Sequence, residues 1–134
     1  MGLVGTKGFY MTLKGRQLAA LVNLGLAMAA ADGRLADEEN VAMCLELEKF
    51  GVKEDDLEKL FAIAQTMSNT EAITIISAMT DEQKKHASGF LAAIMVADGN
   101  IDISEAKLWA LICVLGQLPS MTIKEAISFW NSKH

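Results

Sequence analysis

Two copies of one sequence pattern occupy most of the chain, and this repeat constrains the fold more than any other feature. Residues 24–35 and residues 90–101 each contain an apolar run followed by an Asp-Gly pair, at a constant offset of 66 positions. A pattern that occurs twice predicts two similar structural halves, and two copies are too few for an open solenoid. We therefore expect a closed, pseudo-symmetric bundle, with repeat one at about 18–66 and repeat two at about 84–132.

The composition assigns this repeat to helices rather than strands. Of the 134 residues, 51% are apolar but only 6% are aromatic, and 8 are Met. Ala, Leu, Ile and Met supply the apolar content, which favours helices and a single domain with its own core. The pattern predicts an all-α bundle of about seven helices. We expect these at 13–31, 37–50, 54–67, a short segment up to 79, 80–97, 103–116 and 120–133.

The apolar content raises the question of a membrane segment. The uncharged stretches 17–31 and 108–123 are both interrupted by polar residues and are shorter than the roughly 18 to 20 apolar residues that a span requires. Lysines and an arginine precede the apolar run 18–26, and this combination resembles a signal peptide. Asn23 interrupts that run, and its pattern recurs in the second repeat, so we interpret it as a helix of the mature domain. We expect a domain at 12–134 after a flexible N-terminus at 1–11.

Charge and cysteine content limit the partners and the compartment. The chain has 17 acidic and 12 basic residues, a net charge of −5, which excludes the basic surface on which nucleic-acid binding depends. Cys44 and Cys113 match no metal-binding or redox spacing, and apolar residues surround both. We interpret them as free thiols of a cytoplasmic protein.

The two Asp-Gly turns carry the most specific motif, Asp-Gly-x-(Leu/Ile)-x-x-x-Glu. It joins Asp32 to Glu39 in the first copy and Asp98 to Glu105 in the second. This spacing resembles the second half of an EF-hand loop, but the leading ligand positions are apolar in both copies. A hard cation needs about six or more oxygen ligands, so neither turn alone forms a calcium site.

The position of the two aspartates leaves two interpretations open. Asp32 and Asp98 follow predicted helices, where the helix dipole disfavours an anion by about 0.3 to 1 kcal/mol. Each carboxylate could accept the backbone N–H of Leu35 or Ile101 in an Asx turn that orients the next helix. Alternatively, each Asp and the Glu of its own motif could coordinate a divalent cation (Ca²⁺, Mg²⁺ or Mn²⁺) jointly, alone or with carboxylates of the other copy. The distance from Asp32 to Asp98 distinguishes these interpretations.

Other candidate residues favour binding over catalysis. The only histidines are His86 and the last residue, His134, and no phosphate-binding loop, activated nucleophile or acid–base pair is evident. We therefore predict that the protein is not an enzyme. A run of acids begins the helix predicted at 54–67, where it forms either a solvated helix start or a docking surface for a protein partner. Its members are Glu54, Asp55, Asp56 and Glu58.

With both Asp-Gly motifs in register, the chain resembles the TerB-like family of tellurite-resistance proteins and related domains. This resemblance implies an all-helical fold of about seven helices and a divalent-cation-associated acidic surface. That surface would consist of the four motif acids: Asp32, Glu39, Asp98 and Glu105. It further implies a cytosolic stress protein, or alternatively an interaction module without metal, as in a related domain of a membrane-anchored J-domain co-chaperone. One departure is Ala36, where the second copy has Asp102 as a helix cap.

Overall fold

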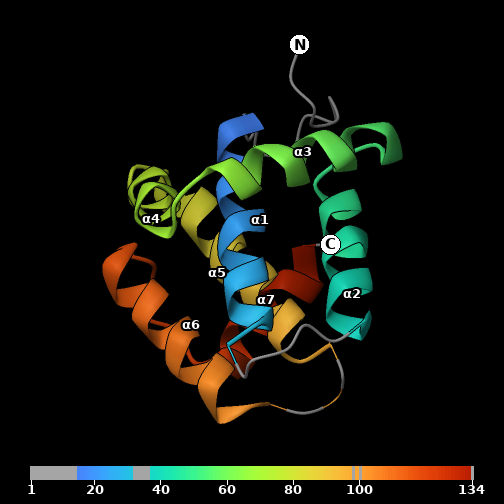
Figure 1. The fold of residues 1–134 in the computed structure, drawn as a ribbon. Coiled ribbons are helices and arrows are strands. Elements are labelled where there is room, and N and C mark those ends of the chain that lie inside the picture. The colour runs from blue at the N-terminus through green and yellow to red at the C-terminus, as the bar shows by residue number, and fades with distance from the viewer. Residues whose placement is uncertain (1–14, 32–36, 98, 100, 134) are drawn as a thin grey trace.

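A computed structural model shows a helical bundle (Figure 1). It describes residues 15–31, 37–97, 99 and 101–133, with the side chains of 37–40 excepted. These residues form seven α-helices and no strand, which confirms the predicted fold class. The helices are α1 (Gly15–Ala29), α2 (Asp37–Lys49), α3 (Glu54–Thr66), α4 (Asn69–Ser77), α5 (Asp81–Met95), α6 (Ile103–Leu115) and α7 (Ile123–Lys133). The predicted flexible segment 1–11 lies outside the described residues.

Local capping determines where several helices begin. Thr80 and Gln83 exchange side-chain and backbone hydrogen bonds in the capping box that the sequence predicts for α5. The last helix begins three residues later than predicted, at Ile123, because Thr122 and Glu125 form a second reciprocal pair. The Thr122 N–H donates to Glu125 Oε1 at 2.8 Å, and the Glu125 N–H donates to Thr122 Oγ1 at 3.1 Å.

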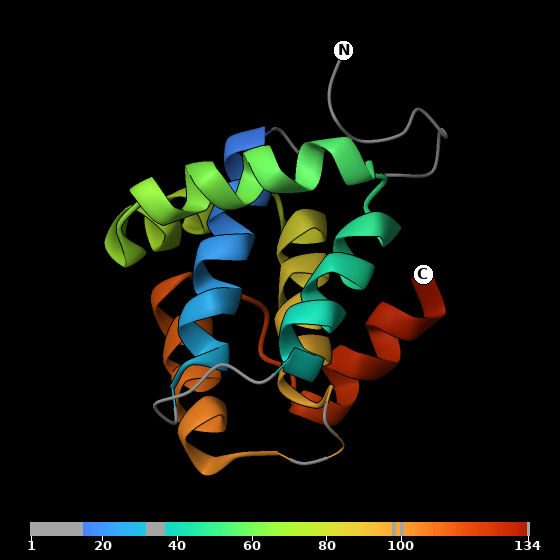
Figure 2. The same ribbon diagram turned by 45° about the vertical axis from the view of Figure 1, so that its right-hand side comes forward.

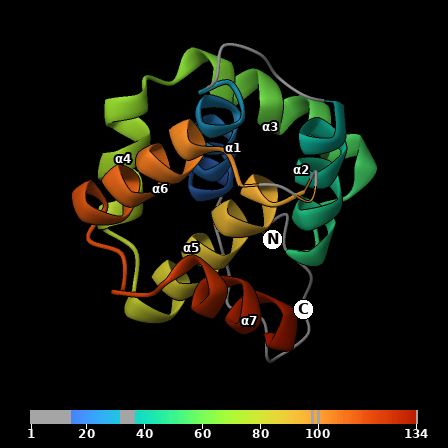
Figure 3. The same ribbon diagram turned by 90° about the horizontal axis from the view of Figure 1, so that it is seen from below.

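Helices α1 and α5 occupy the middle of the bundle. Both are buried over most of their length, and they pack against each other. Helices α3 and α4 pack on α1, while α7 packs along α5 (Figure 2). Helices α2 and α6 lie on opposite sides of α1, as the view from below shows (Figure 3). The run 18–26 is thus part of the core, and among the described helices none is long and apolar enough to cross a membrane.

Asn23 explains why a polar residue interrupts the apolar run of α1. Its side-chain amide is buried and donates to the carbonyl oxygens of Ala64, at 3.0 Å, and Met67, at 2.7 Å. These carbonyls belong to the C-terminal end of α3, where the helix itself supplies no donors. Asn23 therefore caps a neighbouring helix and fixes α3 on α1.

Aromatic residues join α7 to the rest of the bundle. Trp130 is fully buried, packs against Phe50 and Phe90, and donates its indole N–H to Glu46. His86 lies beside Trp130 and is also buried, with its Nε2 3.6 Å from Glu82 on the same helix. These contacts connect α2, α5 and α7, so Trp130 is a core residue.

Candidate functional site

Both Asp-Gly segments connect helices that meet at one end of the bundle. Helices α1 and α5 end there, and α2 and α6 begin there (Figures 1 and 2). We call this region the turn end. Its helices also follow the repeat, because α5 and α6 have the bounds of α1 and α2 shifted by 66 positions. The pseudo-symmetric relation of the two halves in space stays a prediction.

The structure describes the four predicted metal ligands to different extents. Asp32 and Asp98 lie outside the described residues, as does the Asx turn predicted for each. Glu39 is the third residue of α2 and is described by its backbone alone. Glu105 is the third residue of α6 and is described in full. The first copy and the second therefore place a glutamate at the same position of their second helix.

Glu105 is held at the turn end by the cap of α6. The Asp102 carboxylate accepts the N–H groups of Ser104, at 2.9 Å, and Glu105, at 3.2 Å. This N-cap was predicted from the spacing of the two acids. The Glu105 side chain is only 3% exposed, which the sequence did not indicate. Burying a carboxylate costs free energy unless hydrogen bonds or a positive charge compensate it.

The described side chains do not form a metal site by themselves. Within the described part of the chain, no three His, Cys, Asp or Glu residues gather around one point. A site at the turn end would therefore draw on Asp32, Glu39 or Asp98 in addition to Glu105. His134, the second histidine, lies outside the described residues, and His86 is enclosed by aromatic rings.

The acidic run predicted as a docking surface forms the start of α3, at the other end of the bundle (Figure 1). Glu54, Asp55 and Glu58 are exposed, and Asp56 is half-buried. Three of these acids lie in the first turn, where the helix dipole favours negative charge. A shallow hollow of about 380 Å³ adjoins Asp55 and Glu58.

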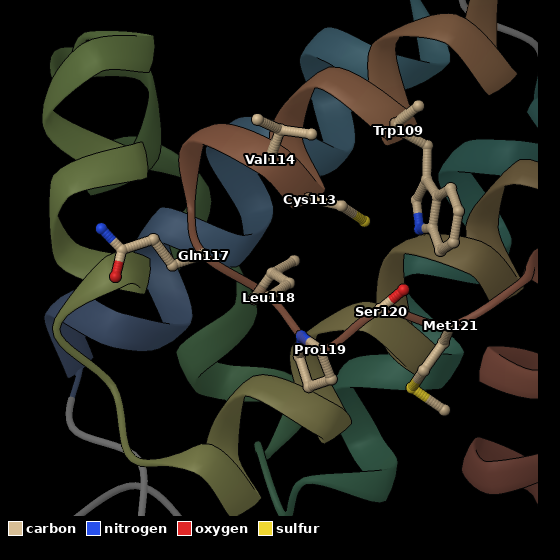
Figure 4. Close-up of a pocket in the computed structure, with 9 residues that line it drawn as sticks. Trp109, Cys113, Val114, Gln117, Leu118, Pro119, Ser120 and Met121 are labelled. Atoms are coloured by element: carbon tan, nitrogen blue, oxygen red, sulfur yellow. The ribbon is translucent and has the colours of Figure 1, made fainter.

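A second hollow, of about 320 Å³, lies between the end of α6 and the segment that leads to α7. Figure 4 shows the Trp109 indole and the Cys113 sulfur on its α6 side, opposite Ser120 and Met121. Burial raises the pKa of the Cys113 thiol to about 11. Burial and the charge of Glu48 also raise the pKa of Cys44. Both thiols are free and stay protonated at neutral pH, which makes them poor nucleophiles.

Comparison with known proteins identifies the family. The family model for tellurite resistance protein TerB matches residues 17–126, which is most of the chain. The chain belongs to the TerB family. The match includes both Asp-Gly segments and all four predicted metal ligands, so the candidate site lies within the TerB region.

A solved structure supports this fold assignment. The chain is similar to a protein of unknown function from Porphyromonas gingivalis W83, with 34% sequence identity and a TM-score of 0.83. The similarity covers 98% of this chain and 99% of that one. The comparison with curated proteins found no match. The TerB assignment therefore gives this chain a family and a fold.

Proposed function

We propose that this TerB-family protein is a non-enzymatic, cytosolic stress protein of the tellurite-resistance type that binds a divalent cation at its turn end. The observation that carries this proposal is the convergence of four helix termini at one end (Figure 2). The Asp32 and Asp98 segments each join two of these helices, so the convergence supports a single site at the turn end. Acids of the two repeats can then contribute to one site.

The chemistry of the donors fits a hard cation. Asp32, Glu39, Asp98 and Glu105 supply carboxylate oxygens, the ligands that Ca²⁺, Mg²⁺ and Mn²⁺ prefer. Four carboxylates in proximity repel one another, and a divalent cation reduces this repulsion. Glu105 supports the proposal because the Asp102 cap, which accepts its N–H, fixes its position in the first turn of α6 at the turn end. The protonated thiols of Cys44 and Cys113 support a binding role over catalysis.

Thermal unfolding with and without cation tests the proposal. A ligand that binds only the folded state stabilises it by about 2.7 kcal/mol at a concentration 100 times its Kd. We expect millimolar Ca²⁺, Mg²⁺ or Mn²⁺ to raise the Tm of the natural protein. The Asp32→Ala/Asp98→Ala variant should lose this response, and Glu105→Gln should weaken it.

Glu58→Gln is the matched control, because it removes one exposed acidic charge from α3, at the other end of the bundle. This variant should keep the full response to cation. Equal Tm values for the natural protein with and without all three cations would contradict the proposal. So would a response that survives in the Asp32→Ala/Asp98→Ala variant, since the cation would then bind elsewhere.

The acidic start of α3 supports a second candidate function, an interaction module that needs no metal. Its exposed carboxylates are available to a basic segment of a protein partner, and the adjoining hollow gives that partner a surface to contact. Charge complementarity of this kind chiefly sets association rate and specificity.

Capture experiments in the presence of a chelator separate the two functions. We expect the natural protein and Asp32→Ala/Asp98→Ala to retain a partner, and Asp55→Lys/Glu58→Lys to lose it. Reversing the charge of Asp55, in the first turn, costs about 0.3–1 kcal/mol through the helix dipole, so folding is checked by circular dichroism. Retention of the partner by Asp55→Lys/Glu58→Lys would exclude this surface.

A further inference from the structure

Helix α6 has an outer face that the bundle leaves uncovered. Its sequence is strongly apolar, with apolar residues spread nearly evenly around the helix, a pattern typical of a helix that is buried all round. Nevertheless Leu111 is 52% exposed and Val114 is 74% exposed. Lys107 lies one turn before Leu111 on the same face and is exposed. The α6 face, defined as Lys107, Leu111 and Val114, is thus an apolar stripe with one positive charge.

Helix α2 presents a matching face on the opposite side of the molecule. Val41 is 58% exposed, Leu45 is 52% exposed, and Glu48 is exposed as well. The α2 face, defined as these three residues, has spacings of four and three positions, as the α6 face does. Residues at these spacings share one side of a helix. The α2 face is therefore an apolar stripe with one negative charge.

The two faces complement each other when the helices run antiparallel. Lys107 then lies opposite Glu48, Leu111 opposite Leu45, and Val114 opposite Val41. In the parallel arrangement both charges would face the valine of the other stripe instead of each other. The same test excludes pairing of identical faces, because α6 on α6 gives Lys107 no carboxylate in the stripe. Complementary charge thus favours one orientation of α6 on α2.

We propose that the α6 face of one molecule binds the α2 face of a second copy, in a head-to-tail association. One molecule cannot make this contact within itself, because α2 and α6 lie on opposite sides of α1 (Figures 1 and 3). Elsewhere the net charge of −5 makes copies repel, whereas Lys107 attracts an acid here. A contact between different surfaces repeats from copy to copy, so it builds chains or rings rather than closed twofold dimers.

The association should be weak. One helix from each molecule buries less area than the roughly 1,200–2,000 Å² of a stable protein interface. We expect sedimentation velocity to show a weight-average sedimentation coefficient that rises with protein concentration up to about 1 mM, as for a self-association with a Kd of about that concentration. A coefficient that stays at the monomer value throughout this range would overturn the proposal.

Two single variants test the head-to-tail geometry. Leu45→Glu blocks the α2 face and Leu111→Glu blocks the α6 face, and each protein alone should lose association by at least tenfold. Their equimolar mixture should form 1:1 dimers and nothing larger, because one intact face of each kind remains. Failure of the mixture to associate would overturn the proposal. Self-association of Leu45→Glu alone would also overturn it, since that result means that α6 pairs with α6.

Charge exchange gives an independent test of the orientation. Lys107→Glu and Glu48→Lys should each weaken association, and the double variant should restore it. No rescue in the double variant would contradict the antiparallel pairing. Ile63→Glu, on an exposed position of α3, is the matched control and should associate like the natural protein. Because all substituted side chains are exposed, circular dichroism should show that every variant folds.

Discussion

Gln117 shows how a single residue can carry backbone strain. It follows α6 with φ of 55°, a left-handed conformation that costs a residue with a side chain about 1–2 kcal/mol. The Leu118 N–H donates to the Cys113 carbonyl at 2.9 Å, which completes a Schellman end. At the equivalent end of α2, the left-handed residue is Gly51, with φ of 90°, and the Val52 N–H donates to Leu47. The second copy thus keeps the turn without its usual glycine.

We predict that Gln117→Gly stabilises the protein by about 0.5–1 kcal/mol. Glycine adopts the left-handed conformation without steric cost, although it loses more backbone entropy on folding. At the equivalent position of the first copy, Gly51→Ala should destabilise the protein by about 1 kcal/mol or more, because alanine is strained in the left-handed conformation. Urea denaturation of both variants measures the two effects. Equal free energies of unfolding for Gln117→Gly and the natural protein would show that position 117 carries no strain.

At the scale of elements, the approach of α7 to α5 depends on Gly89. A Cβ atom at Gly89 would lie 2.7 Å from the Cβ of Trp130 and 3.1 Å from the Ala126 carbonyl oxygen. Both atoms belong to the stem and backbone of α7, so a rotamer change cannot relieve the contact. Gly25, within α1, meets only the flexible end of Met43 and the δ-methyl of Ile94, at 3.2 and 3.3 Å. Gly25 and Gly89 therefore have different roles.

We predict that Gly89→Ala destabilises the protein by about 1–2 kcal/mol. Overpacking typically costs about 1–3 kcal/mol, and the better helix propensity of alanine offsets at most about 1 kcal/mol of it. Gly25→Ala is the matched control, with the same gain in propensity and neighbours that can move. It should be neutral or slightly stabilising. Thermal denaturation compares the two, and equal Tm values would contradict a glycine-dependent α5–α7 contact.

For the whole molecule, the arrangement of the helices separates three surfaces. The helices that flank the two Asp-Gly segments meet at the turn end, the start of α3 forms an acidic surface at the other end, and α2 and α6 have exposed apolar residues and lie on opposite sides of α1. A cation at the turn end and association through the sides would therefore be independent. The Asp32→Ala/Asp98→Ala variant should lose the first without losing the second.

The sequence by itself determined the properties that depend on near neighbours. It predicted the TerB family, the all-α class, the position of each helix to within a few residues and the caps at Thr80 and Asp102. Helix periodicity and capping are encoded within a few consecutive residues, which is why these predictions succeeded. The late start of α7 was missed although Thr122 and Glu125 have the same capping spacing as Thr80 and Gln83.

Only the tertiary structure decided what lies together and what stays exposed. It brought the ends of α1 and α5 to one end of the bundle, buried Glu105, and left Leu111 and Val114 uncovered. In α6 the apolar pattern is nearly uniform around the helix, so periodicity could not indicate which side faces the core. Burial and convergence depend on contacts between residues far apart in the chain, and those contacts exist only once the helices have packed.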